Sequence, residues 1–302
     1  MDSRTGLLEF LDERDWPQFP QWVCEAGLSD PFGLLPAWAP VPTVVGHGLD
    51  RDEARTEVLL AALAGYASLA VDHRRLLPDR NGTAEWGWDP ISGAPRPIPA
   101  ELAFPALVAE GSAYRPPTGA AAGPSWQEAL SEGTRQHCAV LLEQRLADFE
   151  GPLPRLDVPG FPLNERADHL RRLLGEVGEP AVAHDLTGLL SIPACALRVG
   201  ADTVLAVGST LTAALGEALD RGLLAWQART EDRPDCAPHT VPGIPAEQET
   251  SPEASRPKST GTPPSARALR ALGFTPVVIA LDHDPEAARI LPYLVQVVIL
   301  DE

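Results

Sequence analysis

Lysine is almost absent from this sequence. The 24 basic residues include one lysine, Lys258, which lies in a tract rich in proline, serine and threonine. Lysine-based Schiff-base or phosphate chemistry is therefore not expected. Acidic residues outnumber basic ones by 42 to 24, and the resulting net charge of −18 repels a phosphate backbone. Because no arginine cluster with interleaved aromatic residues offsets this charge, we expect no nucleic-acid partner.

Paired cysteines and long apolar runs are also missing. The 4 cysteines are scattered, with no C-x-x-C pair and no cysteine and histidine spacing typical of zinc. The N-terminus lacks the apolar segment of a signal peptide, and no run approaches the ~18 apolar residues of a membrane span. The sequence thus predicts a soluble cytoplasmic protein with reduced thiols, no metal site and no membrane partner.

What the sequence does contain is a repeated helix signal. Three segments each have a turn with glycine, a capping candidate and a helical run rich in alanine and leucine: 44–76, 117–142 and 207–229. Asp50 with Glu53, and Ser125 with Glu128, have the spacing of a capping box, which satisfies free backbone N–H groups at a helix start. We therefore expect three long helices that begin at these turns.

Short apolar runs between these helices predict buried strands at 179–186, 192–200, 202–208, 275–283 and 294–302. Strand and helix signals alternate, which favours an α/β (mixed α+β) fold with helices layered on mixed β-sheets. His184–Asp185 and Asp282–Asp284 lie at predicted strand ends, where solvated turns are the ordinary interpretation.

Residues 231–265 differ from the rest of the chain, since they are rich in proline and have few large apolar residues and no periodicity. This composition predicts a disordered insertion. A helix, turn and strand pattern resumes at residue 266, so we expect residues 1–230 and 266–302 to form one domain.

Six segments carry distinctive motifs, among them a glycine-rich turn with its helix and a strand pair of the D-L-T…I-P type. In chain order they are MDSRTGLLEFL, GHGLDRDEARTEVLLAALAGY, EWGWDPISGAPRPIPAELAF, TGAAAGPSWQEAL, HDLTGLLSIPACALRV and ALGFTPVVIALDHDPEAARILPYLVQVVIL. In this order they resemble the YcaO superfamily over nearly the whole chain. The resemblance implies a fold in which carboxylates from facing helices hold magnesium and ATP. Active relatives phosphorylate a peptide amide oxygen, which leads to azoline rings, thioamides or amidines in ribosomally made peptides, and this chemistry needs metal-bound ATP.

On the first helix, the family pattern has a serine, two glutamates and an arginine. The matching positions here are Glu57, Ala61, Ala64 and Gly65. No shift of register restores the carboxylates, because residues 58–71 contain no acid. Two metal-binding acids and the arginine are therefore expected to be lost.

On the second helix, the family pattern has three glutamates on one face, followed by an arginine. The matching positions are Glu128, Gln136, Ala139 and Val140, so one acid survives, and Glu128 is also the capping candidate. A rival register would use Glu143 and Arg145. On the third helix, whose alignment is the least certain, Arg221 and Trp226 fall where an acid and an arginine are expected.

The resemblance thus gives a vestigial nucleotide and magnesium site with these members: Glu57, Ala61, Ala64, Gly119, Gly123, Ser125, Glu128, Gln136 and Ala139. The glycines and the alanine run also fit the ordinary packing and turn requirements of an inherited fold. Because Mg²⁺ needs one or two carboxylates beside phosphate oxygens, we expect no catalytic residues, no bound metal and no cofactor.

The leading hypothesis is a catalytically degenerate YcaO-like subunit, a pseudoenzyme that acts as partner, scaffold or substrate-presenting protein in ribosomal peptide modification. Its expected partners are an active YcaO enzyme or a leader-peptide-binding protein, with the precursor peptide or a second copy of the chain as further possibilities. The alternative is an active ATP-dependent cyclodehydratase or thioamidation enzyme that binds Mg-ATP through displaced ligands: Glu57, Glu128, Glu132 and Glu143. The third hypothesis is a module that binds a small molecule or a peptide outside such a pathway.

Overall fold

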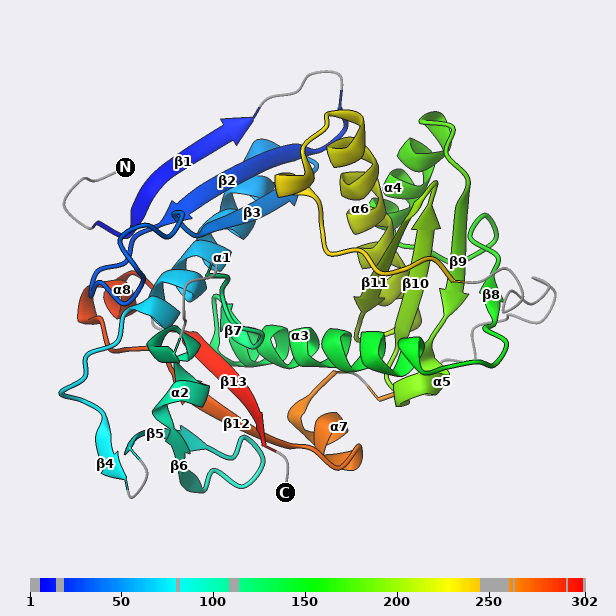
Figure 1. The fold of residues 1–302 in the computed structure, drawn as a ribbon. Coiled ribbons are helices and arrows are strands. Elements are labelled where there is room, and N and C mark those ends of the chain that lie inside the picture. Colours follow the sequence, from blue (N-terminus) through cyan, green and yellow to red (C-terminus); the bar gives the residue numbers. More distant parts are fainter. Residues whose placement is uncertain are drawn as a thin grey trace. The chain divides into compact units, whose positions relative to one another are not determined.

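The computed structural model describes residues 6–14, 19–79, 82–108, 114–244, 261–262, 264–291 and 293–300. The chain forms two compact units. Unit 1 comprises Met1–His137 and Leu269–Glu302, and unit 2 comprises Cys138–Ala268. Figure 1 shows the elements of both units along the chain. Among the described residues, every helix is too short or too polar to cross a bilayer.

Unit 1 begins with an antiparallel sheet of order β1-β2-β3, which α1 covers. The bounds are β1 Leu8–Arg14, β2 Trp22–Leu28, β3 Thr43–Gly48 and α1 Arg51–Leu69. Cys24, Ala26 and Leu28 of β2 pack in one cluster with Ala54 and Val58 of α1. Burial of this apolar surface fixes the helix on the sheet.

The helix start of α1 follows the predicted capping pattern. The Asp50 carboxylate accepts a hydrogen bond from the backbone N–H of Glu53 at 2.9 Å. The Glu53 carboxylate in turn accepts one from the N–H of Leu49 at 2.8 Å. Both bonds satisfy donors that have no partner inside the helix.

A second sheet of unit 1 has the order β4-β5-β12-β13-β7, and β6 also pairs with β5. The bounds are β4 Leu77–Asp79, β5 Gly82–Trp88, β6 Pro95–Pro99, β7 Ala120–Ala122, β12 Thr275–Ala280 and β13 Leu294–Leu300. The short helices α2 Ala100–Ala103, η1 Pro105–Val108 and α8 Pro285–Ile290 also belong to this unit. In Figure 1 the red strand β13 lies beside the orange strand β12.

Unit 2 contains an antiparallel sheet of order β11-β10-β9-β8. The bounds are β8 Arg155–Leu156, β9 Ala181–Asp185, β10 Ala194–Val199 and β11 Asp202–Val207. Helix α6 (Leu211–Thr230) packs on β10 and β11, and α4 (Glu165–Glu176) packs on α6 (Figure 1). The unit also holds α5 Thr187–Leu190 and η2 Pro234–Cys236. Two helices run across the unit boundary, α3 Trp126–Ala147 and α7 Ala266–Ala271.

The predicted fold class is confirmed. Helices α1, α3 and α6 begin in the three predicted helical segments, although α3 continues to Ala147, beyond the predicted end at residue 142, and α6 to Thr230. Strands β9, β10, β11, β12 and β13 lie in the five predicted strand segments. Helices cover sheets in both units, and every strand pair among the described residues is antiparallel. The division into one domain with residues 231–265 as an insertion stays a prediction.

Part of that proposed insertion is described by the structure. Residues 231–244 follow α6 and include η2; Cys236 and Ile244 are buried, and Val241 forms an isolated bridge with Thr203 of β11. Burial of these apolar side chains and the bridge to β11 explain why this part of the segment is ordered on unit 2. Residues 245–260 and 263, to which the prediction of disorder also applies, lie outside the described residues.

Candidate functional site

The first group of predicted site residues lies on α1. Glu57 is exposed, and its Oε2 accepts a hydrogen bond from the backbone N–H of His47 at 2.9 Å. The same oxygen lies 3.3 Å from Nδ1 of the His47 ring. Ala61 is half-buried, and Ala64 is buried in the core of unit 1. At these positions the helix offers one carboxylate, which is engaged by β3, and two methyl groups.

The second group begins at the turn before β7. Gly119 has φ +94°, a backbone conformation that favours glycine. Its buried N–H donates to Oε1 of Gln136 at 2.9 Å, and its carbonyl accepts from the N–H of Val297 at 2.9 Å. A Cβ at this position would lie 2.1 Å from the Val297 carbonyl oxygen. Glycine is therefore required here for packing against β13.

The alanines after Gly119 form a strand. Ala120–Ala122 pair with Gln296, Val295 and Leu294 of β13. The resemblance implies a glycine-rich turn in this segment that would belong to a nucleotide site. The structure instead places these residues in β7, where they pair with β13. Their small side chains allow α1 to pack closely against β7. Their backbone groups serve the sheet ladder.

Gly123, Ser125 and Glu128 form the start of α3. The N–H of Gly123 donates to the carbonyl of Tyr293 at 3.3 Å. The Ser125 hydroxyl accepts from the N–H of Glu128 at 3.2 Å, as the capping pattern predicts. Glu128 itself is exposed. The described contacts of Ser125 are thus those of a helix cap.

Gln136 binds the turn through both ends of its amide. Besides accepting from Gly119, it donates from Nε2 to the carbonyl of Ala120 at 3.3 Å and to Oε1 of Glu132 at 3.1 Å. Glu132 also pairs with Arg135 at 2.7 Å. A glutamate in place of Gln136 could accept but not donate, and it would face Glu132 four residues earlier on the same helix. We call this hydrogen-bonded set of Gly119, Ala120 and Gln136 the α3 clamp.

The neighbouring residue His137 strengthens the link between α3 and β13. Its Nε2 lies 2.8 Å from the carbonyl oxygen of Val297. A carbonyl only accepts, so Nε2 carries the proton and donates. Burial lowers the pKa of His137 below its ordinary value of 6.5. The folded protein therefore holds this ring in its neutral form.

Stability of unit 1 should consequently depend on pH through His137. The unfolded chain binds a proton more readily than the folded one, so this contribution is complete above about pH 6.5 and is lost as the pH falls below it. We expect His137→Gln, whose amide can still donate to Val297, to show a smaller loss of unfolding free energy between pH 7 and pH 5 than the wild type. Urea unfolding at both pH values measures this, and equal losses would contradict it.

Three further predicted positions belong to unit 2. Ala139 is half-buried on the part of α3 that belongs to unit 2. Glu143, the acid of the rival register, pairs with His239 at 2.9 Å. Arg221 of α6 donates to Glu217 at 2.8 Å and to the carbonyl of Leu205 at 3.2 Å. These contacts are all internal to unit 2.

The alternative magnesium ligands can be judged by their geometry. Among the described residues, Glu57, Glu128, Glu132 and Glu143 belong to no group of three ligand atoms close enough to share one metal ion. Glu57, Glu132 and Glu143 also have protein partners in His47, Arg135 and His239.

Unit 1 contains a buried cluster around His283 that the sequence does not predict. His283 was assigned to a solvated turn, but it is 4% exposed and its ring lies 4.8 Å from the ring of Phe104. Its Nδ1 accepts from the N–H of Asp72 at 3.1 Å, so its Nε2 donates to Glu85 at 2.8 Å. The assignment was wrong because a strand-end position does not reveal that Phe104, distant in sequence, covers the ring.

The chain is similar in structure to several solved proteins. A YcaO protein from Methanopyrus kandleri, bound with AMPPCP and Mg²⁺, gives a TM-score of 0.64 at 14% identity over 98% of this chain and 86% of the other. A heterocyclase in complex with substrate and cofactor gives a TM-score of 0.60 at 16% identity, over 98% of this chain and 50% of the heterocyclase chain. This chain has a YcaO-like fold.

The E. coli microcin synthetase McbBCD complex gives a TM-score of 0.53 at 9% identity over 96% of this chain and 87% of the other. No family profile and no curated protein matches the sequence. The YcaO-like fold expected from six short motifs is thus confirmed by structure, at identities that show the architecture alone.

Proposed function

We propose that this chain is a catalytically degenerate YcaO-like subunit that acts as partner, scaffold or substrate-presenting protein in ribosomal peptide modification. The α3 clamp carries the proposal. The Gly119 N–H, which a phosphate cradle would direct at a nucleotide, donates to Gln136, the residue at a position where the family has a glutamate. The site therefore stabilises the fold with the groups that would otherwise bind a nucleotide.

The side chains at the family's metal-binding positions do not fit Mg-ATP. Magnesium requires oxygen ligands in a near-octahedral arrangement, usually one or two carboxylates with phosphate oxygens and waters. Ala61, Ala64 and Ala139 supply none, and the Gln136 amide is bound on both sides by backbone and Glu132. A net charge of −18 would further oppose a nucleotide without its metal. We derive no phosphoryl-transfer step for this chain.

A partner role is supported by the kind of protein that shares this fold. One of the similar structures is a complex, the microcin synthetase McbBCD, and another is a heterocyclase with its substrate. The expected partner of this chain is an active YcaO enzyme or a leader-peptide-binding protein from the same pathway. A second copy of the chain is the other candidate.

Complex formation tests the proposal directly. We expect the purified chain to co-elute in size-exclusion chromatography with an active YcaO protein or a leader-binding protein encoded beside it, at micromolar concentrations. The chain alone, measured by light scattering in the same run, reports whether it dimerises. Migration of every pair as separate species would contradict a partner role.

The second candidate, an active ATP-dependent enzyme, is favoured by one observation. Glu128 is exposed and, among the described residues, its carboxylate has no protein partner, so it could serve as a displaced ligand. Isothermal titration with Mg-ATP separates the two functions. We expect no binding heat for the wild type; tight binding that Glu128→Ala abolishes would support the enzyme instead.

A further inference from the structure

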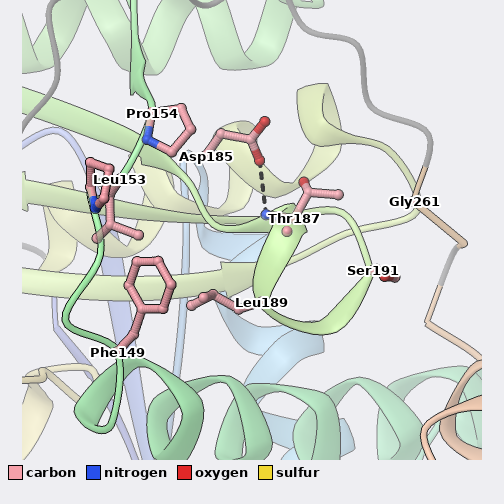
Figure 2. Close-up of a pocket in the computed structure, with 10 residues that line it drawn as sticks. Phe149, Leu153, Pro154, Asp185, Thr187, Leu189, Ser191 and Gly261 are labelled. Carbon is pink, nitrogen blue, oxygen red and sulfur yellow. Dashed lines mark hydrogen bonds between the residues drawn. The ribbon is translucent and has the colours of Figure 1, made fainter.

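A pocket of about 510 Å³ lies within unit 2, and none of its lining residues belongs to the vestigial site (Figure 2). It is formed by the segment after α3, the end of β9, helix α5 and Gly261. Residues 185–191, which begin with the D-L-T motif, supply five of its ten lining residues, and the proposed nucleotide site does not use them. The lining residues include Phe149, Leu153, Pro154, Asp185, Leu189 and Ser191.

The pocket carries one charge. Among its lining residues Asp185 has the one ionisable side chain, and no arginine, lysine or histidine stands among them. Oδ1 of Asp185 accepts a hydrogen bond from the N–H of Thr187 at 2.9 Å. Within the described part of the chain, Oδ2 accepts no hydrogen bond, so the carboxylate keeps an acceptor for a ligand.

Apolar surface accompanies this charge. Figure 2 shows the side chains of Phe149, Leu153 and Leu189 close together, with the Asp185 carboxylate apart from them beside Thr187. Leu153 is buried, while Phe149 and Leu189 are half-buried and present part of their surface to the pocket. The wall thus combines an apolar region with a carboxylate at one side of it.

Backbone bonds hold this arrangement before any ligand arrives. The N–H of Asp185 donates to the carbonyl of Pro154 at 2.8 Å, which joins the two sides of the wall. The carbonyl of Ser191, which has φ 56°, accepts from the N–H of Thr262 at 2.9 Å. A preformed pocket loses little conformational entropy on binding.

We propose that this pocket binds a peptide segment in which an arginine or lysine is flanked by apolar residues. The methylene groups of such a side chain pack on Phe149 and Leu189 while its charged end reaches Asp185. The inference rests on the proposed function in one respect, that the peptide is the precursor or partner segment of the same pathway.

Charge and size favour this occupant. The negative pocket sits in a chain of net charge −18, which attracts a cationic segment and repels an anionic one. Small-ligand pockets span about 300 to 1,000 Å³, so a volume of about 510 Å³ accommodates a long side chain with part of its neighbouring residues. A free cation would leave the apolar wall in contact with water.

Peptide binding can be measured by fluorescence anisotropy with the full-length chain. The probe is a labelled heptapeptide with one arginine between two leucines, and its match carries neutral citrulline in place of arginine. We expect the arginine peptide to bind about tenfold more tightly, because citrulline can still donate a hydrogen bond to Asp185 but lacks the positive charge that strengthens it. Equal affinities, or no binding of either peptide, would overturn the inference.

Variants locate the interaction. Asp185→Asn keeps an acceptor for Thr187 and should weaken the arginine peptide about tenfold without changing the citrulline peptide. Asp157→Asn, the same change at an exposed residue that does not line the pocket, should have no effect. If Asp185→Asn binds the arginine peptide as tightly as the wild type does, the peptide does not bind at this pocket. If free arginine amide competes at the same concentration as the peptide, the ligand is a single amino acid and not a peptide segment.

These outcomes are separable from the proposed function. If the chain binds the arginine and citrulline peptides equally but still forms a complex with a YcaO partner, only the inference about this pocket is wrong. Absence of the complex while the arginine peptide still depends on Asp185 removes the proposed function alone.

Discussion

Gly119→Ala is expected to lower the free energy of unfolding by about 3 kcal/mol. Two causes add. The residue has φ +94°, which disfavours any Cβ, and the new methyl carbon would lie 2.1 Å from the Val297 carbonyl oxygen and 2.6 Å from Nε2 of His137. Neither neighbour can retreat easily, because Val297 belongs to β13 and His137 is bonded to it. The substitution should therefore separate β7 and α3 from β13.

Gly93→Ala is the matched control for this variant. Gly93 also has a positive φ, +71°, but a Cβ there would meet no atom within 4 Å. We expect it to lose about 1 kcal/mol, the cost of the backbone conformation alone. Urea unfolding followed by tryptophan fluorescence compares the two. Equal losses would mean that the close approach to Val297 contributes nothing.

Gln136→Ala is expected to cost about 2 kcal/mol. The buried N–H of Gly119 loses its acceptor, the carbonyl of Ala120 loses a donor, and nothing in the described structure replaces them. Gln127→Ala, an exposed change on the same helix, should stay within about 0.5 kcal/mol of the wild type. Equal stability of the two variants would show that the α3 clamp does not hold the turn.

Gln136→Glu extends the same experiment to the proposed function. This change restores the residue type that active YcaO relatives are expected to have, and it keeps an acceptor for Gly119. It removes the donor to Ala120 and adds a carboxylate near Glu132, so stability should fall between those of Gln136→Ala and the wild type. We expect no Mg-ATP binding, since Ala61 and Ala64 remain; binding by this single variant would mean that one acid separates the chain from an active site.

The parts of the fold that the sequence predicts are those with local signals. Helix α1 could be placed because Asp50 and Glu53 mark its start and alanine and leucine fill its turns. Strands such as β10 and β11 were predicted because each is a short apolar run. The pairing of β7 with β13 could not be foreseen, since residues 120–122 and 294–296 meet through the tertiary fold and neither segment carries a sign of the other.

The sequence predicts which residues occupy the candidate site, but it does not predict the contacts that they make. The sequence identifies Gln136 as a position where an acid is expected, but it says nothing of what an amide does there. The hydrogen bonds of Gln136 to Gly119 and Ala120 depend on the positive φ of Gly119 and on the pairing of β7 with β13, both of which are set by the fold. The pocket around Asp185 was missed for a similar reason, because the D-L-T motif meets Phe149 and Leu153 only after unit 2 has folded.

The order of strands in unit 1 has a consequence for synthesis on the ribosome. Strands β12 and β13 complete a sheet that begins with β4 and β5, yet they are translated after the whole of unit 2. Unit 2 is one continuous stretch and can fold as soon as it emerges, whereas the earlier part of unit 1 must wait with apolar surface exposed. The nascent chain is therefore expected to recruit a chaperone to residues 1–137, which are translated before unit 2 and completed only after it.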